Sequence, residues 1–370
     1  MPKRALDPSH GALPFDAAGL PPMLARTLDA LPEGAPGSWL FEPKWDGFRA
    51  IAMRSAEDLL LQSRDLKPLN RYFPELEAAL QPLLPAGCAL DGEIVIAGPH
   101  GLDFDALLQR IHPADSRVQR LARETPASFV AFDLLALDGE DLRERPQAER
   151  RLLLQALLAD SPPPLHLTPM TLDPAVARAW HSRFEGAGLD GVMAKAADAP
   201  YLTGERAMFK IKHVRTADCV VGGLRWRAGA PQPEVASLLL GLHDAAGVLQ
   251  HVGSASGFSQ DVRRRFAELL APLVLPAGAS HPWHGEGPAG QRRPGAPSRW
   301  SSAKDLAWVA LVPERVCEVR YDHLQGDRFR HVTRFERWRP DKPPADCGYD
   351  QLATTPPYEL QRVFGSTSAG

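Results

Sequence analysis

A lysine beside a turn signal is the first group in this sequence that could do covalent chemistry. Lys44 follows the strand-like run 39–43 and precedes Asp46 and Gly47, and a second strand-like run, 49–54, comes next. A lysine is nucleophilic only when burial or neighbouring charge lowers its pKa. In a pocket between two strands, Lys44 could attack an electrophilic phosphorus and carry the product as a phosphoramidate. The alternative is a hairpin turn with a solvated lysine, which the motif by itself favours.

Two acidic stretches offer partners for such a lysine. Glu93 stands in a strand-like run with Ile and Val, where a buried acid is costly unless it is paired or used. It could accept hydrogen bonds from a ribose or bind a metal, and the alternative is an acid on a sheet edge. Asp190 precedes Gly191 and an apolar run, which could equally be a helix end followed by a core strand.

Three further groups complete the set. Phe132 could stack on a purine or belong to the core. Lys210 and Lys212 alternate along a strand-like run and therefore share a face, where two cations repel unless an anion lies between them; the alternative is a solvated face. Arg64 follows another strand-like run, 59–63, and could simply leave the strand into a loop. Together these groups provide what nucleotidyl transfer requires: a nucleophile, two acids able to hold Mg²⁺, a stacking ring and phosphate-binding cations.

At this point the sequence resembles the ATP-dependent DNA ligases. The resemblance rests on motifs in the family's order over about residues 20–345: 44–49 (KWDGFR), 91–93 (DGE), 132–133 (FD), 190–195 (DGVMAK), 210–212 (KIK) and 339–342 (RPDK). The length, the run 219–223 and Arg330-His331 are most similar to the compact C-type bacterial repair ligases.

The resemblance implies a role for each matched residue. Lys44 would carry AMP, Glu42 would lie near the adenine amine, and Phe132 would stack on the base. Arg49 and Glu93 would contact the ribose, and Arg64 would meet the 5′-phosphate of the nick. The remaining roles concern phosphates and metal: Lys210 and Lys212 at the α-phosphate, Arg339 and Lys342 at the departing pyrophosphate, and Glu93 and Asp190 at Mg²⁺ or Mn²⁺. The family usually has Glu where this chain has Asp190, whose shorter side chain would reach Mg²⁺ through a water molecule.

The composition is that of an ordinary globular protein, with 44% hydrophobic and 24% charged residues among 370. It has neither an apolar run long enough to span a membrane nor the apolar core of a signal peptide, and its four cysteines lack metal-ligand spacing. We therefore expect a cytoplasmic protein with reduced thiols. Net charge is −6 over residues 1–213 and +3 over residues 214–370, where arginines cluster. This asymmetry favours a polyanion partner for the second half.

The elements that must position these groups fall into two domains. Strands alternate with helices up to about residue 213, and short strands with one helix follow, which is typical of an oligonucleotide-binding (OB) barrel. We predict an α+β fold: an extended segment over 1–35, a nucleotidyltransferase domain of antiparallel sheets with flanking helices over 36–213, an OB-fold domain over 214–345 and a tail over 346–370. The loop 276–297, rich in Pro and Gly, has no role that its residues predict.

The implied reaction has three steps: Lys44 takes AMP from ATP, passes it to a 5′-phosphate at a nick, and the 3′-hydroxyl displaces AMP. The partner is nicked double-stranded DNA, with repair proteins as further partners, and we expect a monomer. One alternative is an RNA ligase or a capping enzyme that uses GTP. An alternative of another class is a DNA-binding module without catalysis.

Overall fold

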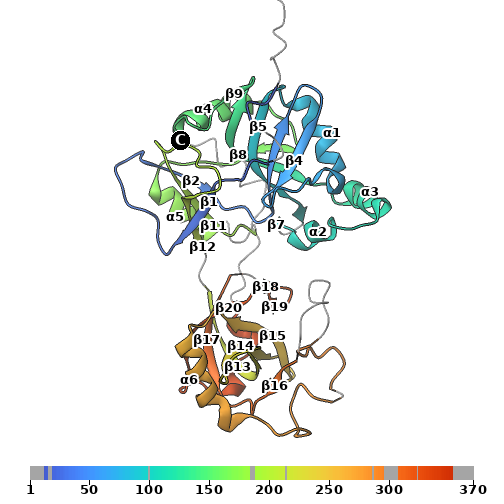
Figure 1. Ribbon diagram of the computed structural model, residues 1–370, viewed down its shortest axis with the longest axis vertical. Coiled ribbons are helices and arrows are strands. Elements are labelled where there is room, and N and C mark those ends of the chain that lie inside the picture. Colours follow the sequence, from blue (N-terminus) through green and yellow to red (C-terminus); the bar gives the residue numbers. More distant parts are fainter. Residues whose placement is uncertain are drawn as a thin grey trace, which may run out of the picture. The chain divides into compact units, whose positions relative to one another are not determined.

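The computed structural model describes residues 12–15, 19–98, 101–183, 188–212, 215–285, 287–295, 307–322 and 324–352. These residues form two compact units, one up to residue 212 and one from residue 215 (Figure 1). Within the described ranges, no helix has the length and apolar character needed to cross a membrane.

The first unit is built on two mainly antiparallel sheets. The smaller sheet has the order β1-β12-β11-β2, and the larger has the order β10-β8-β5-β3-β4, with β9 beside β8. The strands are β1 (Leu24–Leu28), β2 (Trp39–Pro43), β3 (Phe48–Arg54), β4 (Leu59–Ser63), β5 (Cys88–Val95), β8 (Ser128–Leu137), β9 (Glu140–Asp141), β10 (Leu165–Leu167), β11 (Gly191–Ala196) and β12 (Arg206–Lys212), with a small separate pair of β6 (Ala97–Gly98) and β7 (Gly101–Leu102).

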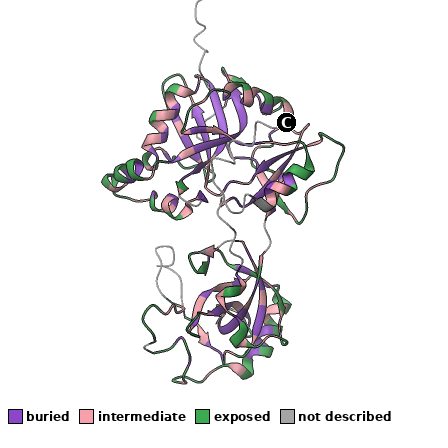
Figure 2. Ribbon diagram, turned by 180° about the vertical axis from the view of Figure 1, so that it is seen from behind, coloured by how far each residue is buried: buried purple, intermediate pink, exposed green. Residues whose placement is uncertain are grey.

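Five helices flank these sheets. They are α1 (Pro74–Leu83), α2 (Phe104–Gln109), α3 (Asp115–Glu124), α4 (Gln147–Leu157) and α5 (Pro174–Arg183). Figure 2 shows the buried strands at the centre and the exposed faces of the helices outside. Apolar residues of α1 and α4, such as Leu76, Leu80 and Leu154, are fully buried in a cluster with strands of the larger sheet. The fold thus buries one face of each helix against the strands of the sheets.

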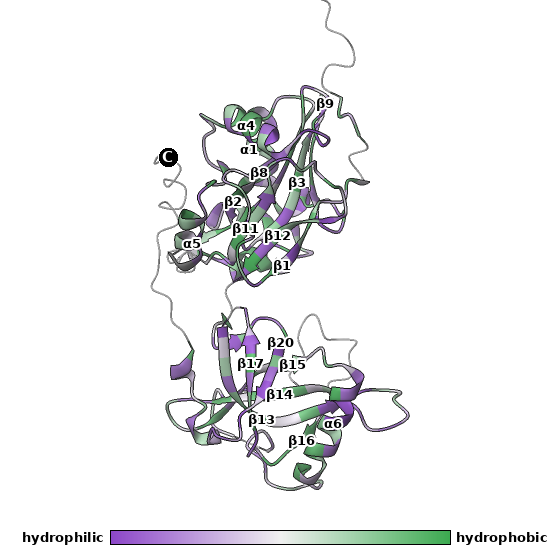
Figure 3. Ribbon diagram, turned by 90° about the vertical axis from the view of Figure 1, so that its left-hand side faces the viewer, coloured by the Kyte–Doolittle hydropathy of each residue, from purple (hydrophilic) through white to green (hydrophobic). Residues whose placement is uncertain are grey.

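The second unit is a closed five-stranded barrel. Its strands are β13 (Arg215–Trp226), β14 (Val235–His243), β15 (Leu249–Ser256), β17 (Val316–Tyr321) and β20 (Thr333–Trp338), and β13 also pairs with the short β16 (Val309–Ala310). The ring closes because β14 pairs with both β13 and β15, while β17 joins β13 to β20. Helix α6 (Gln260–Leu270) packs against β14, and Figure 3 shows apolar segments in barrel strands and in α6. This is the OB-type barrel that the sequence predicted.

Several elements differ from the sequence-based prediction. The run 308–312 forms a strand only at β16, and 328–337 is split between β20 and β19 (Arg328–Phe329), which pairs with β18 (Leu324–Gln325). Helix α3 and the short strand β10 were not predicted, because α3 is strongly polar and β10 has only three residues. The segment expected to be extended over 1–35 contributes β1, which pairs in parallel with β12.

The loop 276–295 is anchored by a tryptophan. Trp283 is 3% exposed, and its indole N–H donates to the carbonyl of Leu249 at 3.0 Å. Its ring lies where a side chain at Gly222 or Gly241 would be, so the two glycines make room for it. The loop therefore contributes a large side chain to the barrel core, a structural role that its composition did not predict.

Candidate functional site

Lys44 lies where the chain passes from one sheet to the other. Strand β2 ends at Pro43 in the smaller sheet and β3 begins at Phe48 in the larger sheet, so the hairpin alternative is wrong. The lysine backbone is held on both sides, because its N–H donates to Gly191 O at 2.9 Å and its carbonyl accepts from Asp190 N–H at 2.8 Å. These bonds fix the lysine against the start of β11.

Gly191 is required at this contact for steric reasons. Its φ is +123°, a conformation that favours glycine, and a Cβ here would lie 2.0 Å from the carbonyl oxygen of Ile211. Any side chain would push β11 away from β12 and move the backbone that holds Lys44. The glycine of the predicted motif therefore sets the position of Lys44.

Asp190 joins two of the predicted lysines. Its Oδ2 atom lies 2.6 Å from Lys44 Nζ and 2.9 Å from Lys212 Nζ, and its side chain is only 5% exposed. The two cations of β12 require a neighbouring anion, and for Lys212 the Asp190 carboxylate is that anion. A carboxylate that neutralises two ammonium groups is a weak candidate for direct metal coordination, and the metal role of Asp190 stays a prediction.

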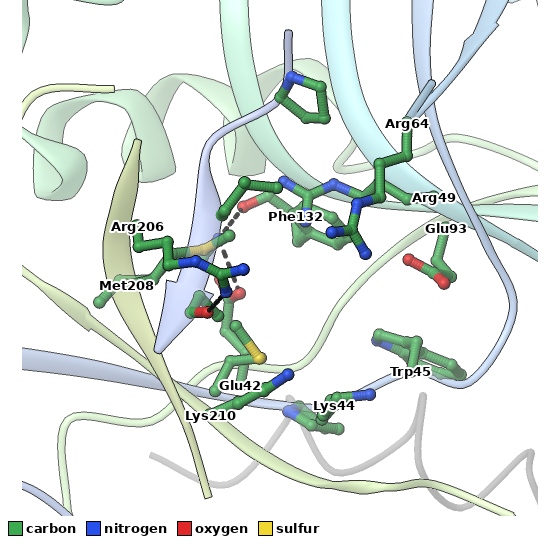
Figure 4. Close-up of a pocket in the computed structure, with 16 residues that line it drawn as sticks. Glu42, Lys44, Trp45, Arg49, Arg64, Glu93, Phe132, Arg206, Met208 and Lys210 are labelled. Carbon is green, nitrogen blue, oxygen red and sulfur yellow. Dashed lines mark hydrogen bonds and ion pairs between the residues drawn. The ribbon is translucent and has the colours of Figure 1, made fainter. Parts of the chain in front are cut away.

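A cavity of about 210 Å³ gathers most of the predicted site residues (Figure 4). Its lining comes from both sheets of the first unit. The predicted residues in the lining are Glu42, Lys44, Arg49, Arg64, Glu93, Phe132 and Lys210. Residues that the sequence did not single out also line it, namely Pro22, Leu24, Ala25, Met193, Lys195, Arg206 and Met208. Seven residues spread over 169 positions of sequence therefore meet at one concave site, which is the arrangement expected of a ligand pocket.

Glu42 belongs to a buried ionic network. Its carboxylate lies 2.9 Å from Lys195 Nζ and 3.3 Å from Arg151 Nη1, and all three side chains are at most 3% exposed. Lys195 also donates to the carbonyl of Phe132 at 2.8 Å, and Arg151 donates to that of Thr168 at 2.7 Å. The network fixes the carboxylate as a hydrogen-bond acceptor at the cavity wall.

Arg49 and Phe132 form a second cluster. Arg49 makes two 2.6 Å hydrogen bonds to Asp91, whose side chain is fully buried and also accepts from the Tyr201 hydroxyl at 2.6 Å. The Arg49 guanidinium carbon lies 4.7 Å from the centre of the Phe132 ring, and Lys195 Nζ lies 4.8 Å from it. Phe132 is 9% exposed, so it is a nearly buried ring at the cavity, and its stacking role stays a prediction.

Glu93 is a carboxylate of the cavity wall on a central strand. Because β5 lies between β3 and β8, the alternative of an acid on a sheet edge is wrong. Burial raises its pKa to about 7, although Arg49 and Lys44 act in the opposite direction, and its Oε1 accepts the N–H of Gly47 at 3.2 Å. Near neutral pH this carboxyl is poised between two protonation states.

Lys210 lines the cavity as a partly desolvated cation. Burial lowers its pKa, and the charges of Lys212 and Lys44 lower it further. A phosphate in this cavity would relieve that repulsion, since it would bring negative charge to a group of cations.

Arg339 and Lys342 lie in the second unit. Arg339 is paired with Asp218 and with Asp341, and the backbone N–H of Lys342 donates to its carbonyl at 3.2 Å. The motif therefore forms a turn directly after β20. Its action on a nucleotide bound in the first unit stays a prediction.

The sequence analysis gave no role to several residues that line the cavity or support its wall. Met193 and Lys195 are two apart on β11, and Met193 is the register partner of Glu42 on β2. The alternation placed both side chains on one face, a signal that the sequence contained. Arg206 and Met208 alternate with Lys210 along β12 and carry the same signal, whereas Arg151, on α4, carried none.

Comparison with known proteins identifies related chains. The family model described as ATP dependent DNA ligase domain matches residues 22–212, and the one described as ATP dependent DNA ligase C terminal region matches residues 231–342. DNA ligase C of Mycobacterium tuberculosis is 51% identical over 338 residues, which cover 90% of this chain and 93% of the relative. DNA ligase C2 of Mycolicibacterium smegmatis is 49% identical over 341 residues, covering 90% and 94%.

Two further matches are more distant. The multifunctional non-homologous end joining protein LigD of Mycobacterium bovis is 31% identical over 336 residues, which cover 90% of this chain but 40% of LigD. Among solved structures, one from a study of DNA binding by Lig E DNA ligases is 17% identical, with a TM-score of 0.52, and covers 86% of this chain and 99% of that one. At this identity the structural match shows a common fold.

Proposed function

This chain belongs to the family of ATP-dependent DNA ligases, and we propose that Lys44 is the residue that carries AMP. The observation that supports the assignment is the position of Lys44 in the wall of the cavity that also contains Glu42, Glu93, Phe132 and Lys210. The backbone bonds to Asp190 and Gly191 hold the lysine there, and its ammonium group lies next to the Asp190 carboxylate, which can accept a proton from it.

The proposed reaction has three displacement steps at phosphorus. In the first, Lys44 Nζ, after passing a proton to the Asp190 carboxylate 2.6 Å away, forms a bond to the α-phosphorus of ATP while the bond to the bridging oxygen breaks, and pyrophosphate leaves. In the second, an oxygen of a 5′-phosphate at a nick attacks the same phosphorus and Lys44 leaves. In the third, the 3′-hydroxyl attacks the 5′-phosphorus, loses its proton and releases AMP, which seals the strand.

The remaining predicted site residues are assigned to parts of the nucleotide and of the nick. Glu42, held as an acceptor, suits the exocyclic amine of adenine, which is a donor, and would repel the carbonyl of guanine. Phe132 supplies the ring on which the base stacks, and Lys210 and Lys212 supply charge at the α-phosphate. Arg49 and Glu93 are assigned to the ribose, Arg64 to the 5′-phosphate of the nick, and Arg339 and Lys342 to pyrophosphate.

A divalent cation fits the cavity wall at Glu93. Within the described residues no three His, Cys, Asp or Glu side chains are grouped to enclose a metal, so phosphate oxygens would complete the coordination. Burial raises the pKa of Glu93 to about 7, and a bound cation would stabilise the ionised form of this carboxyl. When bound, Mg²⁺ or Mn²⁺ supplies charge neutralisation of the triphosphate; Asp190 would act on it only indirectly.

Incubation with α-labelled ATP tests the assignment of Lys44. The wild-type chain should form a covalent adenylate, and Lys44→Ala should form none. A label that survives in Lys44→Ala would refute it. The same assay with GTP, and sealing of nicked RNA against nicked DNA, tests the alternative of an RNA ligase or capping enzyme, for which labelling by GTP is the expected result.

The biological setting follows from the relatives and the substrate. The names of the C-type relatives specify DNA ligases, and LigD is named for end joining. We therefore propose a role in DNA repair, in the cytoplasm, where both ATP and DNA are present. We expect the chain to act as a monomer on nicked double-stranded DNA. Because the barrel half carries a net charge of +3, its binding to DNA should weaken steeply with salt.

A further inference from the structure

Asp218, a residue of β13 in the barrel, is bound to the arginine of the C-terminal motif. Both carboxylate oxygens lie close to Arg339 Nη1, at 2.9 and 3.0 Å. The two side chains are 15% and 20% exposed, so the pair is largely shielded from water. A shielded contact of this kind restricts the orientation of the guanidinium.

The two sides of the guanidinium are held differently. Its Nε and Nη2 atoms donate to Asp341, at 3.0 and 2.8 Å, and that carboxylate is 63% exposed. Hydrogen bonding to Arg339 holds the pKa of Asp341 near 2, so it is ionised at neutral pH. An exposed carboxylate on a turn can leave the guanidinium at little cost, because water replaces its bonds.

Asp218, in contrast, is fixed through its backbone. Its N–H donates to the side chain of Gln351 at 2.7 Å, and its carbonyl accepts from the same side chain at 3.0 Å. Asp218 also sits in a continuous ladder opposite Glu318. Its side chain therefore starts from a rigid support, whereas Asp341 does not.

We propose that Asp218 is a positioning residue for adenylation, which holds Arg339 through Nη1 while the Nε and Nη2 side exchanges Asp341 for a phosphate of ATP. This inference rests on the proposed role of Arg339 at pyrophosphate. The Nε and Nη2 atoms form the fork that matches two phosphate oxygens, and Asp341 occupies that fork when no phosphate is present. Asp218 binds the remaining nitrogen, Nη1, so it can keep its hydrogen bonds while a phosphate binds Nε and Nη2.

The test separates the step that uses ATP from the step that does not. Single-turnover formation of the adenylate from α-labelled ATP measures the first. Sealing of a nick that already carries AMP on its 5′-phosphate measures the final step, which needs no ATP. It also shows that the variant is folded. Asp218→Asn keeps the shape and removes the charge, and it should slow adenylation by about 10- to 100-fold while sealing of the adenylated nick stays within about twofold.

Glu318→Gln is the matched control. Glu318 is the direct cross-strand partner of Asp218 and is 17% exposed, but its salt bridge goes to Arg337. Removal of this charge should leave adenylation within about twofold of the wild type. If Glu318→Gln slows adenylation as much as Asp218→Asn, the effect is one of general charge on this face and the proposal is wrong.

A double variant shows whether Asp218 acts through Arg339. Arg339→Ala should slow adenylation, and adding Asp218→Asn should slow it no further, because nothing remains to be positioned. A further drop of tenfold or more in the double variant, or wild-type adenylation by Asp218→Asn, would overturn the inference. Wild-type adenylation by Arg339→Ala would instead refute the proposed role of Arg339 itself.

A second substitution covers the case in which Asp218→Asn does not fold. Asp218→Glu keeps the charge but displaces the carboxylate by one methylene, so it should also slow adenylation and spare sealing of the adenylated nick. Equal loss of both steps in a folded Asp218→Glu protein would overturn the proposal.

Discussion

Replacing Glu42 with Gln tests the buried network that fixes the cavity wall. The substitution keeps the volume of the side chain and removes its charge, which leaves Lys195 and Arg151 without their shared carboxylate. Both cations are at most 3% exposed. The change therefore creates uncompensated buried charge with almost no change in packing.

The structure allows the expected loss of stability to be estimated. Breaking a buried ion pair by removing one partner costs about 3–5 kcal/mol. Lys195 and Arg151 each keep a backbone carbonyl, at 2.8 and 2.7 Å, so the loss should lie at the lower end, about 3 kcal/mol. Lys195→Met should cost a similar amount, because Arg151, at 3.3 Å, is then the remaining partner of Glu42 in this network.

The assay is urea unfolding of the two single variants and the double variant. The chain has two units, so the relevant transition is the one that ATP shifts to higher urea, since the proposed ATP site lies in the first unit. The double variant should lose about 2 kcal/mol less than the sum of the single losses, because each charge is costly mainly when the other is missing. The same proteins should show weaker adenylation by ATP, with Glu42→Gln discriminating less against GTP.

The exposed pair of Glu140 and Arg145 is the control. Its side chains are 60% and 41% exposed, and Glu140→Gln should cost less than about 1 kcal/mol. Additive losses in the Glu42 and Lys195 cycle, or a Glu42→Gln loss no larger than that of Glu140→Gln, would refute the argument that the network is coupled and buried.

Three further substitutions have defined outcomes. Lys210→Met should slow adenylation and raise the thermal midpoint, because burial lowers the Lys210 pKa and the charged lysine is therefore costly in the folded state. This gain in stability is full at neutral pH and should vanish above about pH 10.4, where the unfolded lysine is also neutral; a gain that persists there would contradict the argument. Gly191→Ala should destabilise the first unit and prevent adenylation, since its Cβ would lie 2.0 Å from the oxygen of Ile211; circular dichroism and labelling check this, and near-wild-type values would contradict it. Trp283→Ala should cost the barrel about 3–5 kcal/mol in urea unfolding, whereas a loss below about 1 kcal/mol would mean that the loop is not anchored there.

Patterns of neighbouring residues predicted much of this fold. The resemblance to the ATP-dependent DNA ligases predicted a lysine nucleophile and its companions, and the order of charged and apolar residues predicted most strands and the change to a barrel after residue 213. Local rules suffice for these features, because alternation along a strand and the residues of a turn are properties of neighbouring positions. The hairpin at Lys44 was the natural local interpretation, and it was wrong because β2 and β3 pair with strands far away in sequence.

The pairing of the charged side chains follows from contacts between strands and helices that are distant in sequence. Asp190 could be expected to serve a metal, but strand pairing places its carboxylate between Lys44 and Lys212. The partners of Glu42 come from α4 and β11, more than one hundred residues away, and their burial makes the network strong. Ion pairs depend on distances of a few ångströms and on the exclusion of water, and neither quantity is a property of local sequence.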